Sequence, residues 1–448
     1  MIKRIIKILL ITFLVLVLAI FYLSFFGIKT DKFNNQIRDN ILKFSKNINL
    51  NLNEVNYLLN PYNFTINVKS ENPQITFKNI KLEIKNITTN ISLRSFINNQ
   101  FIVDNIQIKT EEIKLKNIIA LAKEFKNSPQ LFVLDTVIKD GFVTVNINLN
   151  FDEMGKIKEN FKMEGIVNKA KLNILNQIKL KNLNFNFDIG KNIYSLQRID
   201  MKLNNVKITS PLIEIEKNKN SFFVNGKLLN DKENFDIEKF KLIFPNLLDN
   251  IDLKKIEFSS KNDFTFDINK NFKFNNFKLE TSINLNQLIF NEKNLKLKSY
   301  FPSFVEEIKL EDHKIVINYN KNKFNIKGNG NILLEDKSDN LSYQITKDNI
   351  GFSFDSKINV KNNSLLIDFL DYDKKENLSS LVSINGIFKK NNQLRFNLIN
   401  LKEKNNEISI KGLDLSKNFK ILGIENLNID YMNNKKILNK FNLKKDNS

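Results

Sequence analysis

Residues 143–151 read VTVNINLNF, in which an apolar side chain alternates with threonine or asparagine. Successive side chains of a β-strand point to opposite faces, so a period of two places the apolar groups on one face and the polar groups on the other. This stretch therefore predicts a strand that is buried on one face and wet on the other, as in an antiparallel sheet.

The same alternation recurs along most of the chain after residue 47, with no strict sequence repeat. Short polar segments, such as residues 217–220 and 320–323 and the pair Asp140-Gly141, separate the runs and predict hairpins. The apolar residues whose alternation is clearest are candidates for a functional apolar face: Phe64, Ile66, Val68, Val145, Ile147, Leu149, Phe185, Phe187, Phe264, Phe266, Ile315 and Ile317.

Helical spacing interrupts this pattern in few places. Residues 117–125 (NIIALAKEF) form the best helical stretch, and shorter helical breaks are predicted at 152–160, 244–250 and 301–308. We find no segment rich in Pro, Gly or Ser that would mark a domain linker, since the chain has 6 Pro and 12 Gly. Residues 47–430 are therefore predicted to form one β-rich region.

An apolar run precedes this region. Residues 8–28 read ILLITFLVLVLAIFYLSFFGI and carry no charge. About 20 apolar residues of helix cross a ~30 Å hydrocarbon core, so the run predicts a retained membrane helix. It is longer than the core of a signal peptide and lacks a small-x-small cleavage site. The anchor residues named for this helix are Ile8, Leu14, Leu18, Phe21, Phe25 and Ile28.

The flanks of the run predict its orientation. Lys3, Arg4 and Lys7 precede it, whereas the residues that follow have mixed charge, so the tip at 1–7 is expected in the cytoplasm and the body outside it. Residues 31–46 have apolar side chains at helical spacing and predict an amphipathic helix at the membrane exit. The last segment, 431–448, is predicted to be a polar tail.

Composition excludes several kinds of site. The chain has no cysteine, which rules out a disulfide framework and a thiolate metal site. Its single histidine, His313, stands among charged residues and is predicted to be a solvated loop residue. The net charge is +20, but the basic residues are scattered along the sequence, so no nucleic-acid partner is predicted. We find no catalytic motif and expect neither an enzyme nor a cofactor.

An antiparallel sheet of this length has an apolar face far larger than a soluble monomer exposes. The face could be covered by a second sheet in a sandwich or by closure into a small barrel. Alternatively, the sheet could curl into a U-shaped groove whose inner face holds acyl chains. We expect the third: a mostly β fold with an N-terminal transmembrane helix, an elongated antiparallel sheet curled into a groove, and few short helices.

The order of these features resembles that of the AsmA-like family of bacterial envelope proteins. The resemblance lies in the basic N-terminus, the membrane helix and the exit helix. It extends to four later segments, at residues 53–85 (NEVNYLLNPYNFTINVKSENPQITFKNIKLEIK), 91–115 (ISLRSFINNQFIVDNIQIKTEEIKL), 223–244 (FVNGKLLNDKENFDIEKFKLIF) and 409–431 (SIKGLDLSKNFKILGIENLNIDY). Long members of the family end in a segment that meets the far membrane, whereas this chain ends in NKKILNKFNLKKDNS.

The resemblance implies an inner-membrane anchor and a periplasmic, repeating β-groove, akin to chorein-type bridge proteins. Such a groove would carry phospholipid toward the outer membrane, and other envelope proteins could be its partners. The sequence leaves a second class open, namely a membrane-tethered β-scaffold or assembly factor that recruits partners by edge pairing and transfers no lipid.

Overall fold

A computed structural model describes the chain except for residues 1, 33, 36–47, 78–79, 95–102, 126–127, 153–157, 175–177, 204–205, 236, 239–251, 272, 292–296, 305, 322, 335, 349–350, 390–392 and 446–448. The described chain is mostly β, as predicted, with antiparallel strand pairing. It divides into two compact units, Met1–Lys219 (unit 1) and Asn220–Ser448 (unit 2), within a region that the sequence predicts to be continuous.

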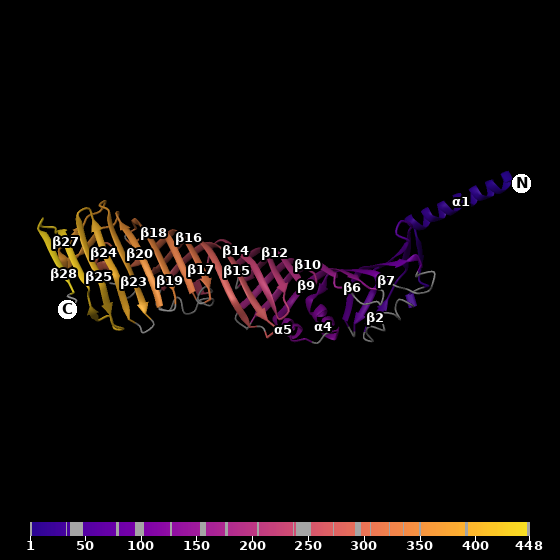
Figure 1. The fold of residues 1–448 in the computed structure, drawn as a ribbon, viewed down its shortest axis with the longest axis horizontal. Coiled ribbons are helices and arrows are strands. Elements are labelled where there is room, and N and C mark those ends of the chain that lie inside the picture. Colours follow the sequence, from indigo (N-terminus) through magenta and orange to yellow (C-terminus); the bar gives the residue numbers. More distant parts are fainter. Residues whose placement is uncertain are drawn as a thin grey trace. The chain divides into compact units, whose positions relative to one another are not determined.

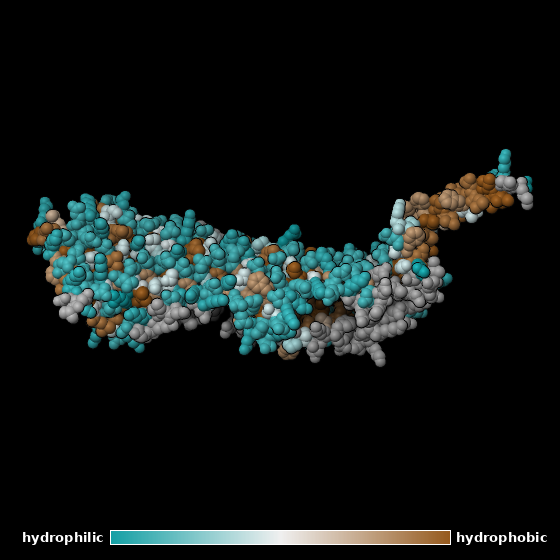
Figure 2. Space-filling model, in the orientation of Figure 1, coloured by the Kyte–Doolittle hydropathy of each residue, from teal (hydrophilic) through white to brown (hydrophobic). Residues whose placement is uncertain are grey.

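The N-terminal apolar run is helical. Helix α1 spans Ile2–Phe25, and its stretch Lys3–Phe25 is long and apolar enough to cross a membrane. Five of the predicted anchor residues lie on α1 and are exposed, and Figure 2 shows this helix as a largely hydrophobic surface: Ile8, Leu14, Leu18, Phe21 and Phe25. Ile28 does not belong to the helix, because it begins strand β1 (Ile28–Thr30).

A glycine joins α1 to the sheet. Gly27 has a φ of +67°, which side-chain-bearing residues rarely adopt, and a Cβ there would lie 2.5 Å from the carbonyl oxygen of Tyr57. Directly after it, β1 pairs with β3 (Val55–Asn60), with Ile28 opposite Tyr57. Helix α1 is therefore followed at once by a strand that joins the sheet through three paired residues. The predicted exit helix at 31–46 falls mostly outside the described residues.

The strands of unit 1 pair antiparallel, each with the next in space. They are β3, β4 (Thr65–Glu71), β6 (Ile80–Ser92), β7 (Val103–Thr110), β9 (Ile138–Asn150), β10 (Lys162–Ile174), β11 (Ile178–Ile189), β12 (Ile193–Leu203) and β13 (Val206–Lys217). Short strands add to the sheet beside β6 and β9: β2 (Ile48–Asn51) and β5 (Gln74–Phe77) near β6, and β8 (Ile113–Lys114) on β9.

Two helices pack on unit 1. Helix α4 (Leu115–Phe125) confirms the predicted helix at 117–125, and α5 (Pro129–Val137) follows with its N-terminus capped by Ser128. Both contact β9, near which Figure 1 draws them. The predicted turn at Asp140-Gly141 is wrong, because both residues lie inside β9 and Asp140 is opposite Lys171 of β10.

Unit 2 repeats the antiparallel pattern, as Figure 1 shows. Its strands are β14 (Ser221–Asn234), β15 (Asp252–Asn269), β16 (Phe274–Asn291), β17 (Glu307–Asn320), β18 (Lys323–Leu333), β19 (Ser338–Lys347), β20 (Gly351–Val360), β23 (Ser380–Lys389), β24 (Leu394–Glu403), β25 (Asn406–Leu415), β26 (Ile421–Gly423), β27 (Asn426–Met432) and β28 (Leu438–Lys444).

Three sequence predictions meet different outcomes here. The hairpin turn at 320–323 is confirmed, because β17 pairs with β18 and Asn320 lies opposite Lys323, whereas residues 217–220 join the end of β13 to the start of β14 at the boundary of the two units. The helical break at 301–308 is wrong, since a 3-10 helix lies earlier, at Leu297–Ser299 (η1), and β17 has begun by Glu307. The polar tail at 431–448 is also wrong, because β28 continues the sheet through Lys444 by pairing with β27. The breaks at 152–160 and 244–250 fall mostly or wholly outside the described residues.

Candidate functional site

In unit 1 the strand register gathers the sequence candidates on one face of the sheet. Val68 lies opposite Thr89, which lies opposite Ile106, and Ile106 lies opposite Leu149. A neighbouring row crosses six strands and contains Ser70, Ile87, Ile108, Ile147, Met163 and Ile189. Alternation predicts which side chains share a face within each strand, and the register joins those faces into one surface.

Part of this face is covered. Val145 is 6% exposed in a core with Val143, Val167 and Ala170, and α4 packs Leu115 onto it. Around this core Ile147, Phe185 and Phe187 are half-buried, and the two phenylalanine rings lie 6.4 Å apart between centroids. Ile66 and Val68 belong to a second core with Val55, Tyr57 and Ile91. In unit 1 several of the candidates are therefore packing residues.

Phe64 is the candidate that the structure contradicts. It ends the turn at 61–64 before β4, has a φ of +49°, and is 71% exposed. Its alternation with Ile66 predicts a strand, but Phe64 is the last residue of the turn and β4 begins one residue later, at Thr65. It does not line the apolar face.

In unit 2 the apolar face continues across successive paired strands. The row that starts at Phe264 passes through Leu279, Tyr319, Phe324, Lys347, Phe352, Phe388, Leu394 and Leu415. The adjacent row includes Ile317, and the one after it includes Ile315. The four candidates of unit 2, including Phe266, therefore share one face.

Aromatic rings concentrate in and directly beside this first row. We call Phe264, Phe266, Phe277, Tyr319, Phe324 and Phe352 the aromatic row. Adjacent ring centroids lie 5.8 Å apart for Phe264 and Phe266, 6.5 Å for Phe266 and Phe277, and 5.6 Å for Phe277 and Tyr319. The rings of Phe324 and Phe352 are also 5.6 Å apart. The row remains partly open, since Phe277 is 41% and Phe352 39% exposed.

At the other end of the strands the face of unit 2 is covered by a segment that we call the cap, residues 297–304 and 361–379. It contains η1, the hairpin of β21 (Leu365–Ile367) and β22 (Tyr372–Lys374), and the 3-10 helix η2 (Asp368–Leu370) between them. Phe301, Phe304, Leu365 and Tyr372 of the cap form a core with the strand residues Ile308, Val360, Leu401 and Tyr431 and with Leu334 at the end of β18.

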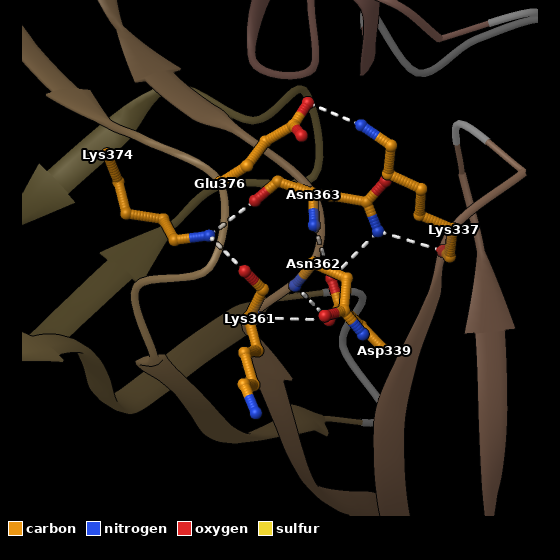
Figure 3. A network of polar contacts seen from close by, with 7 residues as sticks. All are labelled: Lys337, Asp339, Lys361, Asn362, Asn363, Lys374 and Glu376. Carbon is orange, nitrogen blue, oxygen red and sulfur yellow. Dashed lines mark hydrogen bonds and ion pairs between the residues drawn. The ribbon is translucent and has the colours of Figure 1, made fainter.

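A buried polar network fastens the cap to the sheet (Figure 3). The carboxylate of Asp339 on β19 accepts hydrogen bonds from the backbone N–H groups of Lys361 and Asn362, both at 2.8 Å, and Asn363, at 3.2 Å. The Asn363 side-chain amide adds a fourth at 2.7 Å. Consecutive N–H groups that converge in this way form an anion nest. Lys374, fully buried, donates from Nζ to the carbonyl oxygens of Lys361 and Asn363.

The opposite face of the sheet is polar. In unit 1 the residues Asn67, Asn90, Asn105 and Asn150 lie opposite one another across four strands, with Nδ2 of Asn67 donating to Oδ1 of Asn90 at 3.1 Å. Lys162 bridges Glu164 and Asp188, at 3.2 Å and 3.1 Å. Figure 2 shows one face of unit 2 that is likewise mostly hydrophilic. The sheet thus separates a wet surface from an apolar one.

His313 is not the solvated loop residue that the sequence predicted. It lies in β17, is fully buried, and places Nε2 at 2.9 Å from the carbonyl oxygen of Asn331. A β-bulge causes this, because Asp312 has a φ of +55° and the pairing with β18 shifts between Glu311 and Lys314. Gly330 makes room for the ring, since a Cβ there would lie 2.4 Å from it.

The burial of His313 predicts a pH dependence of stability. Desolvation lowers the pKa of His313 in the folded chain below its ordinary value of 6.5. Its stabilising contribution is therefore complete above pH 6.5 and is lost as the pH falls from there toward the folded pKa. We expect the unfolding free energy to fall in that window by at most about 1.4 kcal/mol per pH unit.

Urea denaturation of the full chain between pH 7 and pH 5 measures this dependence. The variant His313→Gln removes the titrating group and should flatten the curve in that window. An unchanged slope in the variant would assign the dependence to other groups.

The described residues contain no group of three His, Cys, Asp or Glu side chains that could hold a metal ion.

No protein-family model, curated protein or solved structure matches the chain. The class that the fold defines is accordingly a coarse one: a β-rich protein with one N-terminal helix able to span a membrane and a sheet with one apolar face.

Proposed function

We propose that this chain is a membrane-anchored lipid-handling protein whose apolar sheet face shields phospholipid acyl chains from water. The observation that carries the proposal is the apolar face of unit 2, which is continuous across the strands and still exposed at Phe277, Phe352 and Phe388. Monomeric soluble proteins rarely leave apolar patches above a few hundred Å² uncovered, and such patches mark binding surfaces.

Acyl chains suit this face chemically. A lipid chain requires only apolar contact, and each buried CH₂ group contributes about 0.8 kcal/mol. The face offers rows of Phe, Ile and Leu side chains rather than a single pocket, which fits a long, featureless ligand. The polar face, with its asparagine ladder in unit 1, can remain in water while the apolar face is occupied.

The anchor adds to this proposal. Helix α1 leads through Gly27 directly into the sheet, so a lipid-holding face would begin near the membrane. We place the helix in a bacterial inner membrane with its basic N-terminus in the cytoplasm and the sheet in the periplasm, on the positive-inside bias of Lys3, Arg4 and Lys7. There the apolar face would contribute to phospholipid transport toward the outer membrane, as the AsmA-like resemblance implies.

Site-specific photocrosslinking in living cells tests the proposal. A photoreactive phenylalanine analogue at Ile317, on the apolar face, is expected to crosslink to phospholipid that mass spectrometry detects on the purified full chain. The matched control is Val316, the preceding residue on the same strand, which points to the other face and is 39% exposed. We expect at least several-fold more lipid adduct at position 317.

Equal lipid adducts at positions 316 and 317 would mean that lipid associates with both faces of the sheet without specificity, and would contradict binding to the apolar face. Protein adducts at position 317 without lipid would contradict the proposal and favour the alternative, a membrane-tethered scaffold that binds other envelope proteins through this face.

A further inference from the structure

The turns that join the strands of unit 2 at one side of the sheet are short and rich in lysine. Here and below, an edge of this sheet means the side formed by the ends of its strands, not an outermost strand. Because successive strands are antiparallel, the connections from β15 to β16, β17 to β18, β19 to β20 and β23 to β24 all lie at the same edge. This edge also carries the aromatic row. We call its lysines the basic rim: Lys270, Lys273, Lys321, Lys323, Lys347 and Lys389.

The basic rim has little local charge compensation. None of its six lysines forms an ion pair with a carboxylate of the described residues. Two acids lie nearby and keep their negative charge: Asp267 accepts a hydrogen bond from Asn276 at 2.8 Å, and Asp348 accepts one from the backbone N–H of Gly351 at 3.1 Å. The six lysines outnumber these two acids, so the rim carries a net positive charge; Lys389 is half-buried and the other five lysines are exposed.

Lysines at the opposite edge of unit 2 differ. There Lys254 pairs with Asp252 at 2.7 Å and Lys309 with Asp336 at 2.7 Å. Two further ion pairs lie in or beside the cap: Lys337 with Glu376 and Lys375 with Asp373. These four lysines are thus ion-paired, whereas none of the six rim lysines pairs with a carboxylate of the described residues.

Lys347 connects the rim to the apolar face. It belongs to the row that starts at Phe264, where it lies between Phe324 and Phe352 on the neighbouring strands. Its Nζ lies 5.3 Å from the centroid of the Phe352 ring. A cation over the end of an aromatic row matches an amphiphile that has a negative head and an apolar tail. The cap at the other end of the strands closes the apolar surface.

From this arrangement we infer that the sheet of unit 2 binds phospholipids with an anionic headgroup in one orientation. The headgroup phosphates lie along the basic rim, and the acyl chains run across the apolar face toward the cap. This inference rests on the proposed function, and it adds a preference for net negative headgroups over zwitterionic ones and a direction of the lipid along the strands, from the rim to the cap.

The test uses the full chain in detergent, incubated with an equimolar mixture of phosphatidylglycerol and phosphatidylethanolamine and then analysed for bound lipid by mass spectrometry. We expect phosphatidylglycerol to be enriched on the wild type. A triple variant with Lys273→Glu, Lys323→Glu and Lys347→Glu should lose the enrichment, since each lysine near an anionic lipid contributes about fivefold in affinity.

The matched control reverses three exposed lysines on the polar face of neighbouring strands, Lys314→Glu, Lys327→Glu and Lys357→Glu, with the same change in net charge. This control should keep the enrichment. If both triple variants lose it equally, the preference comes from net charge and the rim has no role. If the wild type binds both lipids equally, the inference fails while the proposed function stands.

If the wild type retains no lipid, the proposed function fails. Binding of the full chain to anionic vesicles that the rim variant abolishes, without lipid on the purified protein, would also overturn the inference, because the rim would then contact a membrane surface.

Discussion

Val145→Asp is expected to unfold unit 1. Val145 is 6% exposed in the core beneath α4, and its backbone N–H donates to Oγ1 of the buried Thr110 at 2.9 Å. A carboxylate there would lie among apolar core side chains, which costs several kcal/mol against a typical domain stability of about 5–15 kcal/mol. Circular dichroism during heating of the full chain should show the loss of a transition.

The control is Thr144→Asp, one residue earlier on the opposite face of the same strand, which should change stability by less than about 0.5 kcal/mol. The informative comparison is Ile317→Asp in unit 2. Because Ile317 lies on the half-exposed face, its carboxylate can reach water, so the variant should stay folded and lose lipid crosslinking at the position opposite it on β18, Ile326. Unfolding by Ile317→Asp would mean that this face is a dry core.

Strand faces could be predicted from the sequence because alternation is local. Ile315 and Ile317, or Phe264 and Phe266, share a face whatever strand lies beside them. What could not be predicted is the neighbour: Phe324 and Phe352 join Tyr319 in one aromatic row only through the register of four strands. No composition signal marks Phe324 as a member of this row.

The charge pattern could not be predicted for the same reason. The sequence shows lysines at roughly even spacing and predicts no patch, but hairpins of similar length bring every second turn to one edge. Lys273, Lys323 and Lys347 lie far apart in the chain and occupy the same rim. A search for lysines in alternate predicted turns, rather than in contiguous runs, would have found them.

The burial of His313 and the presence of the cap escape prediction for a different reason. The charged neighbours of His313 predict a solvated loop, and the single extra residue of the bulge at Asp312 turns the ring inward. The cap depends on Asp339, which lies more than 20 residues before the backbone groups that it binds. Neither a one-residue bulge nor a contact between distant polar residues leaves a periodic signal.

Asp339→Ala is expected to release the cap. The substitution removes the acceptor of four hydrogen bonds and leaves the N–H groups of Lys361, Asn362 and Asn363 without their partner in a site where Asn363 is fully buried. Each buried donor left unpaired costs about 1–3 kcal/mol, so we expect a total loss of about 3–5 kcal/mol. Limited proteolysis of the full chain should cut within residues 361–379 in the variant and leave the wild type intact there.

Asp368→Ala is the control, because Asp368 is an exposed acid within the same cap, in η2. It should leave the proteolysis pattern unchanged. Asp339→Asn preserves one acceptor oxygen and should give an intermediate result. If Asp339→Ala leaves the cap protected, the apolar contacts of Leu365 and Tyr372 hold it without the polar network, since both side chains are buried against the sheet. The network would then set only the register of the cap on the strands, because only one position of the cap brings its three N–H groups onto the carboxylate.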